Sequence, residues 1–296
     1  MARLRMYALY GENNPYTDVL KEEALKAITG EDLVGYIHNL TSYKHKIWYN
    51  GPLAMKSLTK KLKKAHNAPK TFLPTPTMRE YDMVTRDSKD VFFAHYDMVQ
   101  SEILWLKKSN VFDVKDEAKI SLFNEYFGGG MSSIVFQEIR ESKGLAYSAY
   151  ASYSAPSKKE DPHFLRAFVG SQPDKLKDAV GEMIKLMNEM PEADKQFEMA
   201  KEALLSKMES ERLIKTRVFW SYLNNLDKGL DYDIRKDNYE TIKRATLDDM
   251  KQFFDNQVKG NQFTIALIAN KKDLNKEVLA SFGNVVELNK DELFPY

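Results

Sequence analysis

The sequence feature that most constrains the fold is a run of three consecutive glycines, Gly128 to Gly130, within a stretch of helical periodicity. Each glycine inside a helix costs about 1 kcal/mol relative to alanine, so the run indicates a backbone that needs what glycine allows. We expect either positive φ angles there or another part of the chain packed very closely against it. A phosphate-binding loop is not favoured, because no Gly-Lys-Ser/Thr follows and the run joins two helices. A simple turn between helices remains an alternative for each glycine taken singly.

The segments around the glycines predict helices before and after the run, followed by two strands. Alternation of buried and exposed positions is typical of a strand with one covered face, and Gly144 is well placed to end the second helix. In chain order, we expect a helix over 118–127, a helix from Ser132 or Ser133 to about Lys143, and strands over 147–153 and 164–169.

The first 76 residues predict a separate group of short elements. Thr29 can cap a helix whose early acids suit the positive end of a helix dipole. In chain order, we expect helices over 19–28 and 31–39, a strand over 46–49, a helix over 55–65 and a proline-containing linker over 67–76. The linker suggests a domain boundary.

The helix expected over 55–65 is basic on one side. Nucleic-acid binding through this face is one interpretation, and an ordinary solvated helix surface is the preferred one. The lysines of this face are Lys56, Lys60, Lys61, Lys63 and Lys64.

The remainder of the chain contains mostly helices and ends with two strands. We expect helices over 173–190, 192–226, 235–243, 247–258 and 274–282, and strands over 263–269 and 285–288. Strands that bracket runs of helices, without regular βαβ alternation, predict an α+β fold in which helices pack on a largely antiparallel sheet.

Composition excludes several classes of function. The 44 basic and 43 acidic residues nearly cancel, so we expect neither nucleic acid nor an anionic membrane surface as a partner. There is no cysteine, which excludes disulfides, thiolate nucleophiles and cysteine-ligated zinc. We identify neither an apolar run long enough to span a membrane nor a secretion signal, and the compartment stays open between a bacterial-type cytoplasm and periplasm.

The block from Asn124 to Ser148 resembles the second domain of each half in the pitrilysin/insulinase family of zinc peptidases. The resemblance rests on the glycine turn, on Phe-Gln-Glu-Ile-Arg-Glu at 136–141 and on Gly-Leu-Ala-Tyr-Ser at 144–148. Two looser matches extend it over nearly the whole chain. Thr-Gly-Glu-Asp-Leu at 29–33 resembles a helix start of the preceding domain, and Tyr10 to Tyr16 resembles a Tyr-Gly-x-x-His-Pro-Tyr loop with Asn14 in place of histidine.

The resemblance implies a mitochondrial-processing-peptidase-like fold, with helices on one face of the sheet, and two candidate catalytic residues. In the family an arginine and a tyrosine seven residues apart reach from the carboxy-terminal half toward the zinc of the other half, and here these positions are Arg140 and Tyr147. Guanidinium and phenol groups can donate to a substrate carbonyl or to an oxyanion. We further expect the glycine turn to contribute substrate contacts through Gly128, Gly129, Gly130 and Ser132. Without the resemblance, Arg140 would be interpreted as a surface ion-pairing residue and Tyr147 as a half-buried strand residue.

The zinc motif of such peptidases, His-x-x-Glu-His, is absent from this sequence. None of the five histidines starts it. His95 and Asp97 would share one face of a strand, but a catalytic zinc needs about three protein ligands and no third candidate is suitably spaced. We therefore expect no metal site and no cofactor in this chain, and zinc in a missing amino-terminal half.

These observations predict a carboxy-terminal half without zinc ligands. Residues 1–70 would be the tail of a preceding domain and 77–296 a complete peptidase-family domain, acting on extended peptides together with an amino-terminal half or an active partner subunit. We expect the isolated chain to be catalytically inactive and to be a fragment of a longer protein. Two alternatives remain: an inactive structural or regulatory partner of the same fold, and a module that binds peptides without any protease.

Overall fold

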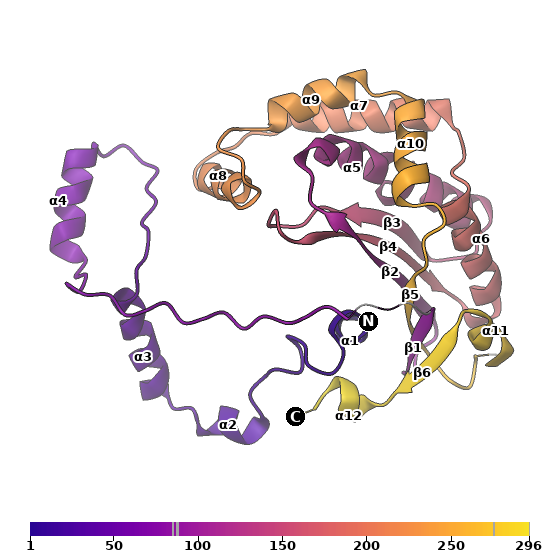
Figure 1. The fold of residues 1–296 in the computed structure, drawn as a ribbon, viewed down its shortest axis with the longest axis horizontal. Coiled ribbons are helices and arrows are strands. Elements are labelled where there is room, and N and C mark those ends of the chain that lie inside the picture. The colour runs from indigo at the N-terminus through magenta and orange to yellow at the C-terminus, as the bar shows by residue number, and fades with distance from the viewer. Residues whose placement is uncertain (85, 87–88, 275, 296) are drawn as a thin grey trace.

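The computed structural model describes residues 1–84, 86, 89–274 and 276–295, and its described residues form a six-stranded mixed sheet (Figure 1). The strand order is β3-β4-β2-β5-β1-β6. The strands are β1 (Asp90–His95), β2 (Ser101–Val111), β3 (Ser148–Ser154), β4 (Pro162–Ser171), β5 (Thr264–Ala269) and β6 (Asn284–Leu288).

Strand directions divide the sheet into two parts. The pairs β3–β4, β4–β2 and β2–β5 are antiparallel, whereas β1 runs parallel to both β5 and β6. The α+β prediction is confirmed, and the expectation of a largely antiparallel sheet holds for β3, β4, β2 and β5. The strands β5 and β6 run in the same direction on either side of β1, and the chain between them contains the helix α11 (Lys276–Ser281).

A layer of helices covers one face of the sheet. Its members are α5 (Glu117–Phe123), the π-helices η3 (Asn124–Gly129) and η4 (Phe136–Ser142), α6 (Leu176–Asn188), α7 (Asp194–Ser210), α9 (Arg235–Arg244) and α10 (Leu247–Gln257). Their apolar stripes and the strand residues facing them form one core, in which Phe93, Tyr126, Phe127 and Leu165 are fully or almost fully buried. This layer is the one that the sequence predicts.

The opposite face of the sheet carries a smaller cover. The helix α1 (Ala2–Tyr10) inserts Leu4 and Ala8 against Phe92 and Leu104, and α12 (Lys290–Leu293) adds Leu293. The sequence analysis assigns no element to residues 1–10, so α1 is a finding of the structure. Residues that precede the predicted boundary at 70–77 thus pack on the sheet that follows it, and the two-domain division stays a prediction.

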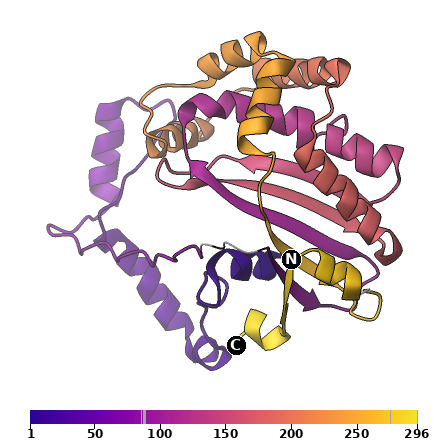
Figure 2. The ribbon, with the colours of Figure 1, turned by 45° about the vertical axis from the view of Figure 1, so that its right-hand side comes forward.

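Between α1 and the sheet the chain makes a long excursion, which we call the arm (residues 19–78). It contains α2 (Glu22–Ala27), α3 (Gly30–Asn39), the short η1 (Leu40–Ser42) and α4 (Met55–Ala65), none of which has a buried residue. Figures 1 and 2 show these helices standing away from the sheet. Thr29 caps α3 through a reciprocal bond pair with Asp32, as predicted.

The strand predicted over 46–49 is wrong for this structure, because these residues pair with no strand of the described chain and are assigned no secondary structure. Trp48 instead contacts two aromatic residues outside the arm: its ring lies 5.4 Å from that of Phe219 and 6.1 Å from that of Tyr222. At the base of the arm, Asp18 binds both the guanidinium of Arg79 and the hydroxyl of Tyr81, each at 2.5 Å. These two contacts close the arm into a loop.

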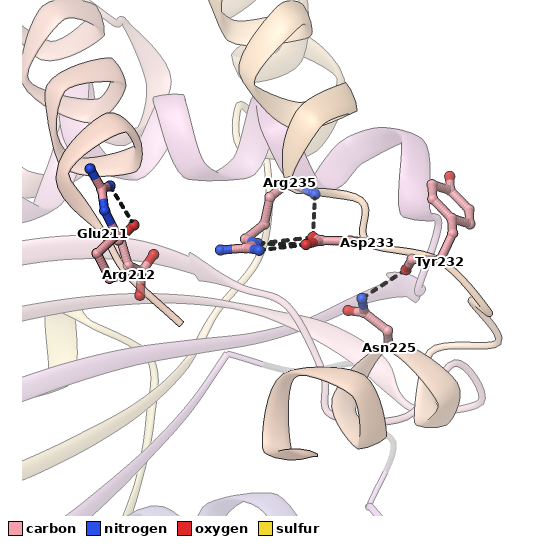
Figure 3. A network of polar contacts seen from close by, with 6 residues as sticks. All are labelled: Glu211, Arg212, Asn225, Tyr232, Asp233 and Arg235. Carbon is pink, nitrogen blue, oxygen red and sulfur yellow. Dashed lines mark hydrogen bonds and ion pairs between the residues drawn. The ribbon is translucent and has the colours of Figure 1, made fainter. Parts of the chain in front are cut away.

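The single helical region predicted over 192–226 is two helices, α7 and α8 (Arg217–Asp227). The break occurs where Glu211 turns extended and Lys215 takes a φ of 53°. Figure 3 shows polar contacts around α8. Before this helix, the Arg212 guanidinium donates to the Glu211 carbonyl at 3.2 Å. At its end, the side-chain amide of Asn225 donates to the Tyr232 carbonyl at 2.8 Å. The Arg235 guanidinium also binds the Asp233 carboxylate, at 2.5 Å.

The helix α11 (Lys276–Ser281) falls within the range predicted as 274–282, of which residue 275 lies outside the described residues. Residue 296, the end of the predicted second domain, lies outside them as well. No helix of the described chain has the length and apolar character needed to cross a bilayer.

A buried histidine makes the stability of this fold sensitive to pH. His163 on β4 lies between the rings of Phe112 and Tyr153, and its Nδ1 donates to the Ser154 carbonyl at 3.2 Å. Burial lowers the pKa of His163 below its ordinary value of 6.5, and the Ser154 carbonyl and the carboxylates of Asp116 and Asp113 offset this only in part.

We expect the free energy of unfolding to fall as the pH drops through 6.5, because the unfolded chain then binds a proton that the folded chain resists. Between the lowered pKa of the folded chain and that of the unfolded chain, the slope from this residue is at most about 1.4 kcal/mol per pH unit. Urea unfolding between pH 5 and 8, for the wild type and His163→Gln, measures it. The stability of the wild type relative to His163→Gln should fall toward pH 5, and parallel curves would contradict the assignment.

Candidate functional site

The glycine run lies where η3 passes over the edge strand β3. A Cβ built on Gly128 would lie 1.9 Å from the backbone oxygen of Ala151, closer than real Cβ atoms approach any atom. One turn earlier, the Asn124 side chain accepts from the Tyr153 amide at 2.7 Å and donates to the Tyr153 carbonyl at 2.9 Å. Asn124 thereby pairs with the open edge of β3 as a neighbouring strand would. Of the two expectations for the glycines, close packing is the one that the structure shows, since none of the three takes positive φ.

The other residues of the turn have different surroundings. Gly129 is exposed, and a Cβ on Gly130 would lie 3.0 Å from a carboxylate oxygen of Glu125. Ser132 is half-buried, while Ser133 is buried and its hydroxyl accepts from the Phe136 amide at 3.4 Å. Ser133 is therefore the cap of the following helix. Substrate contacts by Gly128, Gly129, Gly130 and Ser132 stay a prediction.

The structure brings Arg140 and Tyr147 together at the surface. The guanidinium of Arg140 lies 5.7 Å from the centre of the Tyr147 ring and 4.8 Å from that of Phe136, so it is held between two aromatic faces. Tyr147 is 72% exposed, and the Arg140 side chain is 42% exposed. Both polar heads are therefore available to a molecule outside the domain.

The backbone between the two residues is fixed by hydrogen bonds. The helix η4 ends at Ser142, and the Gly144 amide bonds to the Arg140 carbonyl at 3.1 Å. Gly144 takes a φ of 57°, which lets the next amide, of Leu145, bond to the Ile139 carbonyl at 2.9 Å. The Ser171 hydroxyl then donates to the Leu145 carbonyl at 2.6 Å, and the Tyr147 amide donates to the Gly170 carbonyl at 2.9 Å. Both side chains thus project from a rigid turn.

Two ion pairs lie near Arg140 and Tyr147. The Glu141 carboxylate lies 3.5 Å from Nε of Arg140 and balances part of its charge, although both groups are well exposed and such pairs contribute little to stability. On the other side of the turn, Lys143 pairs with Glu182 at 2.5 Å. The Arg140 guanidinium and the Tyr147 hydroxyl therefore offer donors suited to an oxygen that develops negative charge.

Phe136, the Gly170 carbonyl and the Ser171 hydroxyl are parts of the site that the sequence analysis does not identify. Phe136 stands four residues before Arg140 on a helix, a spacing that places side chains on one face, and this signal could have indicated the contact. The Gly170–Ser171 anchor is a long-range contact with no signal in the local sequence.

Among the described residues, no three His, Asp or Glu side chains gather as a metal site would require. His95 accepts from the Lys271 amide at 3.2 Å, and Asp97 accepts from the Asn270 side chain at 3.0 Å. His45 and His66 meet through their Nε2 atoms at 2.6 Å in the arm, without a third ligand. The zinc expected in an amino-terminal half stays a prediction.

A larger hollow, of about 600 Å³, lies between α1, α12 and the end of β1. Its lining is mostly apolar and includes neither Arg140 nor Tyr147.

Residues 53–204 match the family model described as the peptidase M16 inactive domain, which is just over half of the chain. The chain belongs to this family. The matched range begins in the arm and ends in α7, so it includes the glycine turn, Arg140 and Tyr147.

Two bacterial proteins are relatives of this M16 inactive domain. The chain is 26% identical over 230 residues to the non-peptidase homolog YmxG of Helicobacter pylori, an alignment that covers 75% of this chain and 51% of that protein. It is 34% identical over 86 residues to an uncharacterized zinc protease YmxG of Bacillus subtilis, covering 28% and 20%. The chain thus spans about half the length of the first relative.

Solved structures share the fold. A conserved protein from Enterococcus faecalis superposes with a TM-score of 0.68 at 15% identity, covering 93% of this chain and 64% of that one. A peptidase M16 inactive domain from Pseudomonas fluorescens gives 0.60 at 16%, covering 91% and 64%. The periplasmic protease PqqL of Escherichia coli gives 0.65 at 13%, covering 91% of this chain and only 30% of that one, so the fold occurs there within a much longer chain.

The contact of Gly128 with β3 predicts a structural penalty for any side chain at this position. We expect Gly128→Ala to lower the free energy of unfolding by about 1–3 kcal/mol, as overpacking does. Gly181→Ala is the matched control, because Gly181 is an exposed helical glycine with nothing within 4 Å of its Cβ position. That change should stabilise the chain by about 0.5–1 kcal/mol. Urea unfolding of both variants measures the difference, and equal stabilities would contradict the close contact.

Proposed function

We propose that this M16 inactive domain is the half of a zinc metalloendopeptidase that does not bind zinc, and that it supplies Arg140 and Tyr147 to peptide hydrolysis. The observation that carries the proposal is the pair itself: two donors in contact, exposed, and mounted on a rigid turn. A surface ion pair would need neither the aromatic sandwich nor the fixed backbone.

The chemistry follows from where charge develops in peptide hydrolysis. When water adds to a peptide carbonyl, its oxygen becomes an oxyanion, and donors aimed at it in advance lower the barrier. The guanidinium adds a full positive charge and several N–H donors, and the phenol adds one O–H. In this proposal zinc and the general base come from another segment, and the chain contributes to binding and orientation.

The arm is the surface through which that other segment binds. Residues 33–79 contain nine Lys and Arg residues and no Asp or Glu, which leaves 35 basic and 43 acidic residues in the rest of the chain. The helix α4 is amphipathic, with lysines beside a stripe of Met55, Leu58 and Leu62 that belongs to neither hydrophobic core of the described chain. Such a stripe, beside the segment 46–49 that is assigned no helix or strand, supports the prediction that the arm completes a preceding domain of the same family.

Variants of the pair test the catalytic role. In the complete peptidase we expect Arg140→Ala to lower turnover of a peptide substrate by about 10²–10³, and Tyr147→Phe to lower it by a similar factor, as loss of an oxyanion donor does. Because both side chains are exposed, the thermal unfolding of the domain should barely change. Lys177→Ala, an exposed residue of α6 that does not contact the pair, is the control and should leave turnover near the wild-type value. Wild-type turnover in both pair variants would overturn the role.

Substitution of the arm tests the partner surface. Leu62→Asp should leave the stability of the isolated chain within about 0.5 kcal/mol, because Leu62 touches no core, yet it should weaken association with the amino-terminal half at least tenfold. Lys61→Asp, on the charged side of the same helix, is the comparison and should weaken association less. Sedimentation of the chain mixed with that half measures both effects, and unchanged association for Leu62→Asp would contradict the assignment.

A second candidate function is favoured by the first relative, which is described as a non-peptidase homolog. In that case the chain is a structural or regulatory partner, and extended peptides bind without being cut. Peptide turnover by the assembled protein distinguishes the two candidates. An active assembly whose turnover is unchanged by the substitutions of Arg140 and Tyr147 supports the second candidate.

A further inference from the structure

A small hollow lies directly beside the candidate pair. It has a volume of about 220 Å³, and its lining residues are Gln100, Gly144, Leu145, Ala146, Tyr147, Gln172 and Lys175. Pockets that hold whole small molecules measure roughly 300–1,000 Å³, so this one fits a single side chain or chain end. Tyr147 contacts Arg140 and also borders the hollow, which places the hollow next to any peptide held by the pair.

The charge of the hollow comes from Lys175. Its ammonium donates to the Gly144 carbonyl at 3.1 Å, which fixes it at the rim and uses one of its three donors. Within the described chain no carboxylate lies at ion-pairing distance from Lys175, whereas Lys143 on the same turn is neutralised by Glu182. The hollow therefore has an uncompensated positive charge.

Two amides complete the set of polar groups. In the described structure the side chains of Gln100 and Gln172 make no hydrogen bond with the protein, so their N–H groups are available to a ligand. The carboxylate nearest in sequence, Asp174, lines a different hollow together with Lys177 and Asp273. An ammonium and two free amides around a site of this size are suited to a carboxylate.

We propose that this hollow is a subsite for a carboxylate of the bound peptide, which gives the peptidase a preference for substrates with an acidic side chain near the scissile bond. The inference rests on the proposed function, because it takes the pair to hold a peptide. The same chemistry would accept the carboxylate at the end of a peptide chain, and the experiment separates the two sources.

Fluorescence polarisation with the full chain tests the subsite. The probes are a fluorescein-labelled dodecapeptide rich in Ser and Thr with Glu at alternate positions, its counterpart with Gln at those positions, and both peptides with an amidated carboxyl end. We expect the amidated Glu peptide to bind about three- to tenfold more tightly than the amidated Gln peptide. Lys175→Met should abolish this difference. Lys177→Met removes the same charge two residues further along, at the start of α6, and should preserve the difference.

Each outcome separates this inference from the proposed function. Equal affinities for the Glu and Gln peptides, or an equal loss of preference in Lys175→Met and Lys177→Met, would overturn the subsite and leave the proposed function in place. A preference that depends only on a free carboxyl end would replace the side-chain subsite by one for the chain end. Failure of every peptide to bind would count against the proposed function itself.

Discussion

The rest of the site depends on the close approach of a helix to an edge strand. At Gly128 the backbone of η3 rests against the carbonyl of Ala151, and Asn124 satisfies the amide and carbonyl of Tyr153 that would otherwise face water. An open strand edge invites pairing with other chains, and this helix covers it. Because η3 is held against β3, the direction in which the chain continues from η3 is fixed. The following helix η4 then carries Arg140 on its exposed side.

The same arrangement explains why the proposed functional residues lie together at one turn. From the end of η4 to the start of β3 the backbone spans only a few residues, and hydrogen bonds from Gly144, Ser171 and Tyr147 fix it. Arg140, Tyr147 and the hollow with Lys175 are then three neighbouring features of one rigid edge of the domain. Rigid placement of donors is what stabilisation of an oxyanion requires, since mobile donors would have to be ordered during the reaction.

The sequence predicted much of this but not all of it. Helical periodicity, the Thr29 cap and the Gly144 stop are local signals, and the corresponding elements are present. The central strand β2 was not predicted. Its apolar run at 103–106 is short, and two lysines, Lys107 and Lys108, follow within the same strand. The strand at 46–49 was predicted from local pattern but lacks a partner in this chain, since a strand forms only where another strand completes it. The packing of Gly128 against Ala151 and the Lys175 hollow come from contacts distant in sequence, which periodicity does not report.

The central claim is that Arg140 and Tyr147 face a reaction centre supplied by another polypeptide segment. A crystal structure of the complete protein with zinc and a phosphinic peptide, which mimics the hydrated peptide bond, measures this directly. The account predicts that the Arg140 guanidinium and the Tyr147 hydroxyl donate to oxygens of the inhibitor at about 2.7–3.1 Å. A structure in which both side chains are covered by a contact between domains, or point away from the metal, would contradict it.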